Sequence, residues 1–91
     1  MKQYPDKKTS DSFLSDKEEE YKLILYNDNF NSIDFVINSL IKICNHSTAQ
    51  ATQCAFIAHY KGKSIIKKGS YALLKPMKDA LSNRGLNTGI E

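Results

Sequence analysis

The chain has 91 residues, of which 41% are hydrophobic and 25% are charged, and its formal net charge is +3 at pH 7. This length predicts one domain with a modest core, and the composition is ordinary for a globular protein. No apolar run is as long as a membrane span, and the first residues are too polar for a secretory leader. We therefore expect a cytoplasmic protein without a membrane partner.

Charge and apolar residues are distributed unevenly along the chain. Residues 1–20 carry four lysines against six acidic residues, a charge of −2, and only Phe13 and Leu14 form an apolar pair. So few apolar side chains cannot offset the entropy lost on ordering, so this segment is predicted to be a flexible tail. Residues 21–91 carry nine basic residues against four acidic ones, or +5. Because this excess lacks the interleaved aromatic residues of a base-stacking surface, we do not expect a nucleic-acid partner.

The first predicted element is a strand over residues 21–26, where five of six residues are apolar or aromatic. It stops at three polar residues, Asn27, Asp28 and Asn29, and a helix follows that Asn31 or Ser32 can cap. Apolar residues at helical spacing define one face of this helix: Ile33, Val36, Ile37, Leu40, Ile41 and Cys44.

A second helix is predicted after Ser47, which forms a capping box with Gln50. Its apolar stripe consists of small residues that permit close packing: Ala51, Cys54, Ala55 and Ala58. His59 lies at its end, and residues 61–63 form a turn around Gly62.

Residues 64–68 are predicted to form a short strand that Gly69 ends. Helical spacing then resumes at Tyr71, but Pro76 interrupts it. Either the main helix begins near Lys75, with Pro76 in its first turn, or a longer helix is kinked. Gly85 ends the helix, and residues 86–91 can form a last strand.

The sequence lacks the motifs expected for a phosphate-binding loop, a metal site or a catalytic centre. Gly62-Lys63-Ser64 lacks the glycine that a phosphate-binding loop needs five residues earlier, where Ile57 stands. Neither Cys-x-x-Cys nor His-x-x-x-His spacing is present, so no metal or other cofactor is expected. No nucleophile, histidine and orienting acid are recognisable as a set, so the sequence does not indicate an enzyme. The four residues weighed as metal ligands are Cys44, His46, Cys54 and His59.

Three motifs together resemble the ClpS family of adaptors for the Clp AAA+ protease. Residues 21–36 are similar to its strand, its Asn-Asp-Asp-Tyr/Phe turn and the start of its first helix. Residues 49–53 resemble the start of its second helix, and residues 59–63 its His-x-x-Gly-Lys signature. The resemblance implies an α+β fold, with a three-stranded antiparallel sheet packed against three helices over residues 21–91. It also implies an adaptor that delivers proteins bearing N-degrons, such as N-terminal Leu, Phe, Tyr or Trp, to the ClpA or ClpC unfoldase and ClpP.

The resemblance also implies a binding site for such an N-terminus. Its α-amino group would be held by Asn27, Asn29 and His59. Its side chain would enter a hydrophobic pocket lined by Leu25, Asn31, Ile33, Val36, Ala55, Ala58 and Leu86.

The chain departs from the family pattern at four of its positions. Asn29 replaces an aspartate, Ser32 replaces a proline, and Ile33 and Ala55 each replace a common methionine. Two alternatives stand beside the adaptor hypothesis. Asn29 suggests a ClpS-like domain that binds the unfoldase but has lost degron selectivity, and the +5 charge of residues 21–91 suggests a small basic domain associated with RNA or the ribosome.

Overall fold

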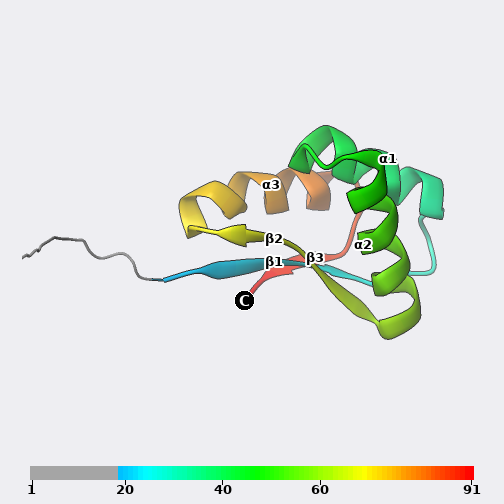
Figure 1. Cartoon of the computed structure of the whole chain (residues 1–91), viewed down its shortest axis with the longest axis horizontal. Coiled ribbons are helices and arrows are strands. Elements are labelled where there is room, and N and C mark those ends of the chain that lie inside the picture. Colours follow the sequence, from blue (N-terminus) through cyan, green and yellow to red (C-terminus); the bar gives the residue numbers. More distant parts are fainter. Residues whose placement is uncertain (1–18) are drawn as a thin grey trace, which may run out of the picture.

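A computed structural model describes residues 19–91 of the chain, and six elements follow one another in the predicted order (Figure 1). Their bounds are β1 (Tyr21–Tyr26), α1 (Ile33–Cys44), α2 (Thr48–Lys61), β2 (Lys63–Gly69), α3 (Tyr71–Asn83) and β3 (Thr88–Ile90). The predicted tail falls almost entirely on residues 1–18, outside the described part.

The three strands form one antiparallel sheet in the order β2-β1-β3, which confirms the predicted fold class. β1 is central and pairs along its whole length with β2, from Tyr21 opposite Gly69 to Tyr26 opposite Lys63. One extra residue in β2, Ile66, makes a bulge opposite the step from Leu23 to Ile24. β3 pairs with the other side of β1.

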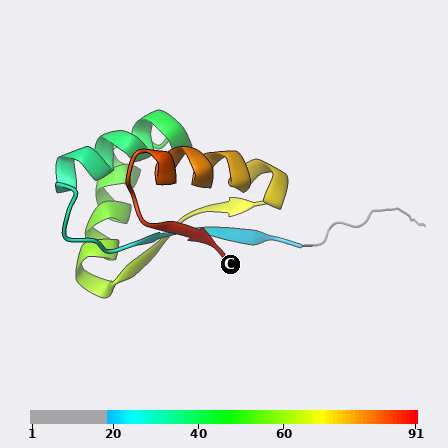
Figure 2. The ribbon, with the colours of Figure 1, turned by 180° about the vertical axis from the view of Figure 1, so that it is seen from behind.

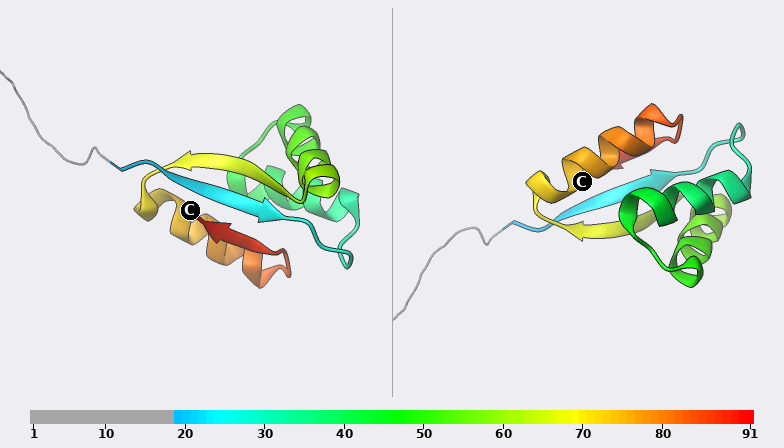
Figure 3. Two further views of the ribbon diagram at one scale, coloured as in Figure 1. Left: turned by 90° about the horizontal axis from the view of Figure 1, so that it is seen from below. Right: turned by 90° about the horizontal axis from the view of Figure 1, so that it is seen from above.

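α1 and α3 lie over one face of the sheet, and α2 runs past the level of the sheet beside the start of β2 (Figures 1 and 2). Seen from below, the sheet lies nearer the viewer than α1 and α3, and no helix of residues 19–91 covers that face (Figure 3). Apolar side chains of the strands and helices meet between the two layers. The buried core there consists of Leu23, Leu25, Leu40, Cys44, Ala51, Ala58, Ile66, Leu74, Leu81 and Leu86.

Side-chain caps fix where the helices begin. Ser32, Ser47 and Ser70 each accept a hydrogen bond from a backbone N–H three residues on, and Gln50 completes the predicted capping box. Of the two residues predicted to cap α1, Asn31 and Ser32, the structure uses Ser32.

Of the two alternatives for the third helix, the one in which it begins near Lys75 is wrong. Ser70 caps it, and it runs from Tyr71 through Pro76. Pro76 cannot donate to the carbonyl of Ala72, but both residues are exposed, so water can hydrogen-bond to that carbonyl.

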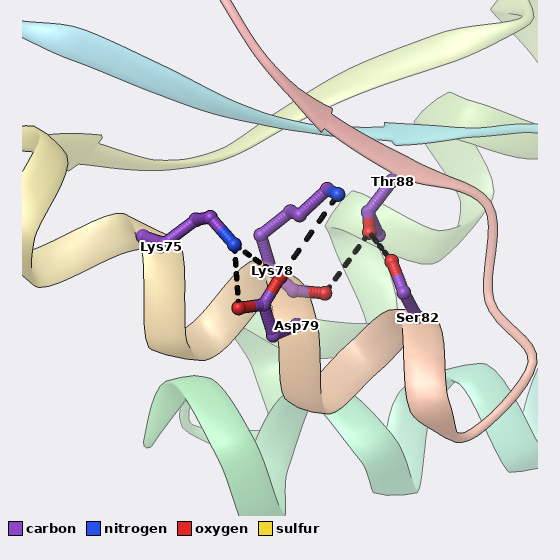
Figure 4. A network of polar contacts seen from close by, with 5 residues as sticks. All are labelled: Lys75, Lys78, Asp79, Ser82 and Thr88. Carbon is purple, nitrogen blue, oxygen red and sulfur yellow. Dashed lines mark hydrogen bonds and ion pairs between the residues drawn. The ribbon is translucent and has the colours of Figure 1, made fainter.

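Polar contacts join the last helix to the last strand (Figure 4), and a further one joins the end of that helix to α1. The Ser82 and Thr88 hydroxyl oxygens lie 2.8 Å apart, and the Thr88 hydroxyl also donates to the carbonyl of Lys78 at 3.4 Å. At the end of α3, Arg84 Nε donates to Ser39 Oγ of α1 at 2.9 Å. These contacts hold the end of α3 against α1 and β3.

Candidate functional site

A cavity of about 200 Å³ opens where β1 ends, between the start of α1 and the last turns of α2. Polar residues of the turn after β1 form one side of it, and apolar residues of both helices form the other. It is lined by Leu25, Tyr26, Asn27, Asp28, Asn29, Asn31, Ile33, Val36, Ala55, Ala58 and His59.

Asp28 holds the turn that forms the polar side of the cavity. Its Oδ1 accepts hydrogen bonds from the backbone N–H groups of Phe30 at 2.9 Å and Asn31 at 2.8 Å. Its Oδ2 accepts from Asn31 Nδ2 at 3.1 Å. An aspartate that binds the backbone amides after it is a common way to fix a turn. Desolvation, the largest single influence, raises the pKa of Asp28, but these hydrogen bonds from Asn31 and Phe30 together lower that pKa below its ordinary value.

Asn31 joins this turn to the end of α3. Its Nδ2 donates both to Asp28 Oδ2 and to the carbonyl of Gly85, at 3.0 Å. Because two acceptors surround Nδ2, the orientation of the amide is fixed, and Oδ1 is the polar atom that the side chain can still offer. Asn31 thus offers a hydrogen-bond acceptor in the wall of the cavity.

Gly62 connects the end of α2 to the turn after β1. It terminates α2 with φ +95°, a conformation that favours glycine, and its N–H donates to the carbonyl of Ala58 at 3.0 Å. Its own carbonyl accepts the N–H of Asn27 at 2.9 Å. The end of α2 is therefore tied directly to the residue after β1, which places Asn27 and His59 on the same rim of the cavity.

His59 lies in the last turn of α2 and is exposed. The edge of one of the His59 and Tyr60 rings meets the face of the other, with centroids 4.9 Å apart. Within residues 19–91 the His59 ring has no hydrogen-bond partner, so it can exchange a hydrogen bond with a ligand.

The apolar side of the cavity is built from small and β-branched residues. Leu25, Ala55 and Ala58 are almost fully buried at its floor, and Ile33 and Val36 of α1 are half-buried. The small side chains at positions 55 and 58 leave the space that constitutes the cavity. A cavity of about 150 Å³ is known to accept a benzene ring, so this one has room for a large apolar side chain.

The structure brings nine of the ten predicted site residues to this cavity and leaves one out. Leu86 is buried in the core instead, because it follows the end of α3 and points between the layers. Sequence reasoning missed Tyr26 and Asp28, which also line the cavity. The polar run after the first strand already contained the signal for Asp28.

The four residues weighed as metal ligands take other positions. Cys44 is buried in the core, and burial raises the pKa of its thiol to about 11. His46 is buried and its Nε2 donates to the carbonyl of Ile66 at 2.7 Å. Cys54 lies on the core side of α2, and His59 lines the cavity. Within residues 19–91, no three His, Cys, Asp or Glu side chains are grouped to hold a metal ion.

A small α+β domain with a cleft that is polar at one end and apolar at the other has the form that ligand-binding sites commonly take. The family described as "ATP-dependent Clp protease adaptor protein ClpS" matches residues 16–88. The chain belongs to the ClpS family, a family of adaptors, as its three motifs predicted.

Curated relatives and one solved structure agree with this assignment. The Clp protease adapter protein ClpS of Salmonella gallinarum is 44% identical over 45 residues, covering 50% of this chain and 42% of that protein. The one of Acetivibrio thermocellus is 34% identical over 59 residues, covering 65% and 60%. The chain therefore spans about half the length of these relatives. Agrobacterium tumefaciens ClpS2 bound to L-phenylalaninamide has the same fold, with a TM-score of 0.75, 20% identity, and coverage of 82% of this chain and 98% of that one.

One finding bears on the membrane. Among the helices of residues 19–91, none combines the length and apolarity that crossing a bilayer requires.

Proposed function

We propose that this protein is an adaptor that binds other proteins by a bulky hydrophobic N-terminal residue with a free α-amino group. In this proposal it hands them to a ClpA- or ClpC-type AAA+ unfoldase and its protease partner ClpP. It works by binding alone, without a catalytic step or a cofactor. The observation that carries the proposal is a single cavity with hydrogen-bonding groups at one end and a small apolar floor at the other.

The polar end suits an α-amino group. With a pKa of about 7.7–8.0, this group is mostly a cation with three N–H donors at neutral pH. Asn27 and Asn29 offer amide oxygens, and a neutral His59 offers a ring nitrogen. Among the lining residues, which all belong to the described part of the chain, Asp28 alone carries a formal negative charge. Its carboxylate supplies the attraction for a cation that Asn29 cannot supply.

The apolar end suits a Leu, Phe, Tyr or Trp side chain. Burial of such a side chain contributes roughly 1.5–3 kcal/mol. Leu25, Ala55 and Ala58 provide an almost dry floor for it. The ligand of Agrobacterium ClpS2, an aromatic amino-acid amide, has the free amine and the apolar side chain that this proposal requires.

The proposal is tested by calorimetry with a peptide that begins with Phe and with the same peptide N-acetylated. Acetylation removes the charge and two of three donors, so only the free peptide should bind. Equal affinity for the two peptides would refute recognition of the amine.

A second candidate function rests on Asn29. Without a carboxylate at that position, the domain could bind the unfoldase and no longer select N-termini. Equal and weak binding of the free and acetylated peptides would favour this alternative, and binding to RNA that falls steeply with salt would instead favour the RNA-associated domain.

The proposed setting is the cytoplasm. Cys44 and Cys54 are both unpaired within the described residues, which fits a reducing compartment. We further propose that residues 1–20 serve delivery rather than binding, because among residues 19–91 the cavity is lined by positions between 25 and 59. Deleting residues 1–20 should then leave peptide affinity nearly constant and reduce degradation of a Leu-starting substrate by the Clp protease.

A further inference from the structure

Two exposed aromatic residues of α2, Phe56 and Tyr60, form a stacked pair that the cavity does not include. Phe56 is 39% exposed and Tyr60 is 75% exposed. Their ring centroids are 6.0 Å apart and the rings are nearly parallel, at 12°. We call them the α2 aromatic pair. A residue four positions on lies on the same helix face, so the pair forms a short apolar stripe along α2.

The α2 aromatic pair is continuous with the cavity. Ala55 and His59 line the cavity, and Phe56 and Tyr60 each follow one of them in the sequence. One step along a helix turns the side-chain direction by about 100°, so the pair occupies the face of α2 next to the one that borders the cavity. The ring contact between His59 and Tyr60, at 4.9 Å, joins the cavity rim to the pair.

Single exposed hydrophobic residues are normal on a protein surface, and a stacked pair adds a few tenths of a kcal/mol to a helix. The position of this pair beside the cavity indicates a role in binding the ligand. A peptide held by its first residue must leave the cavity at its open rim, and an extended chain advances about 3.3 Å per residue. Its second to fourth residues therefore span roughly 10 Å, which is more than the 6.0 Å between the two ring centroids of the pair.

We propose that the α2 aromatic pair binds the second to fourth residues of the same peptide, and that it favours large apolar or aromatic side chains there. This inference rests on the proposed function, because it assumes that the first residue occupies the cavity. Aromatic side chains prefer stacked or edge-to-face contacts with other rings, and Tyr60 presents an exposed ring for such a contact.

The test uses the whole protein and ligands of two lengths. L-phenylalaninamide occupies only the cavity, whereas Phe-Ser-Ser-Ser, Phe-Trp-Ser-Ser and Phe-Ser-Trp-Ser also extend over α2. Calorimetry should give the better Trp peptide an affinity about three- to tenfold above that of the Ser peptide, the range expected for one aromatic contact. Tyr60→Ala and Phe56→Ala should each remove most of this gain and leave the affinity for L-phenylalaninamide unchanged.

Tyr71→Ala is the matched control, because Tyr71 is an exposed tyrosine at the start of α3 and should alter none of these affinities. Equal affinity of the Ser and Trp peptides for the unmodified protein would overturn the inference without any variant. It would also be overturned if Tyr60→Ala weakened L-phenylalaninamide as much as the Trp peptide, since Tyr60 would then only hold His59. If even L-phenylalaninamide fails to bind, the proposed function itself is wrong.

Discussion

Asp28 and Asp79 are both hydrogen-bonded carboxylates with a lowered pKa, yet they occupy different environments. Asp79 on α3 accepts from Lys75 Nζ at 2.7 and 2.9 Å, and Lys78 Nζ lies 4.0 Å away (Figure 4). The hydrogen bond from Lys75 is the main cause of its lowered pKa. Asp28 binds two backbone N–H groups and the amide of Asn31 instead.

The two carboxylates differ in how much conformational entropy their hydrogen-bond donors lose. Lys75 must immobilise a long exposed side chain to reach Asp79, and such surface ion pairs contribute little to stability. The N–H groups of Phe30 and Asn31 are already fixed by the chain, and they would lose their acceptor if Asp28 were removed. A similar pKa direction therefore accompanies a structural role at Asp28 and a minor one at Asp79.

The largest effect is expected for Asp28→Ala. The substitution removes the acceptor of three hydrogen bonds, so the free energy of unfolding should fall by about 1–3 kcal/mol and the cavity rim should lose its shape. Urea unfolding measures the first effect, and titration with L-phenylalaninamide the second, where at least a tenfold loss is expected. Asp79→Ala is the control, and equal losses in the two variants would contradict the comparison.

His59→Ala should affect binding only. The loss of one hydrogen bond to a charged amine should weaken the affinity for a Phe-starting peptide by on the order of 1–3 kcal/mol. Because His59 is exposed, unfolding in urea should not change. An unchanged affinity would mean that His59 contributes only its contact with Tyr60.

Asn29→Asp should tighten binding of the same peptide. A carboxylate makes a charge-assisted hydrogen bond that is roughly twice as strong as a neutral one, so a gain of about 1 kcal/mol is expected. Raising the salt concentration should reduce this gain, because salt screens exposed charges. A variant that binds no more tightly would place position 29 away from the amine.

The smallest effect is on acid stability. Because the pKa of Asp28 is lowered on folding, its ionised form stabilises the protein above about pH 4, and this contribution disappears as pH falls through the lower folded-state pKa. The difference in unfolding free energy between the protein and Asp28→Asn should therefore shrink as pH is lowered from 6 to 2, a proposed range that spans the titration of ordinary aspartate. Asp79→Asn should show a smaller difference that vanishes in about 1 M salt. A difference for Asp28→Asn that stays constant over this range would contradict its lowered pKa.

Much of the fold could be predicted from the sequence because local signals and apolar periodicity agree. Ser47 and Gln50 fix the start of α2, and the abrupt end of apolar residues at Tyr26 marks the end of β1. The placement of Asn27 and His59 on one rim came from the family resemblance, since they are 32 positions apart and no periodicity relates them.

Other features depend on contacts that a sequence does not reveal. Pro76 has a strong local effect, yet the cap at Ser70 and the packing of Leu74 and Leu81 keep one helix through it. Leu86 was assigned to the cavity, but only the path of the chain after Gly85 decides whether it points there or into the core. Similarly, the bond from Asn31 to the carbonyl of Gly85 joins residues that are 54 positions apart.

The central position of β1 has a mechanical consequence. Its two neighbours hold it by hydrogen bonds on both sides, and its last residue leads directly into the turn of the cavity. A force that pulls on residue 20 along the strand axis would shear both ladders at once, so many hydrogen bonds would resist together. At its other end, any displacement of β1 would reach the hydrogen bonds from Tyr26 to Asn87 and from Asn27 to Gly62. The strand thus transmits tension from the N-terminal side of the domain to the rim of the candidate site.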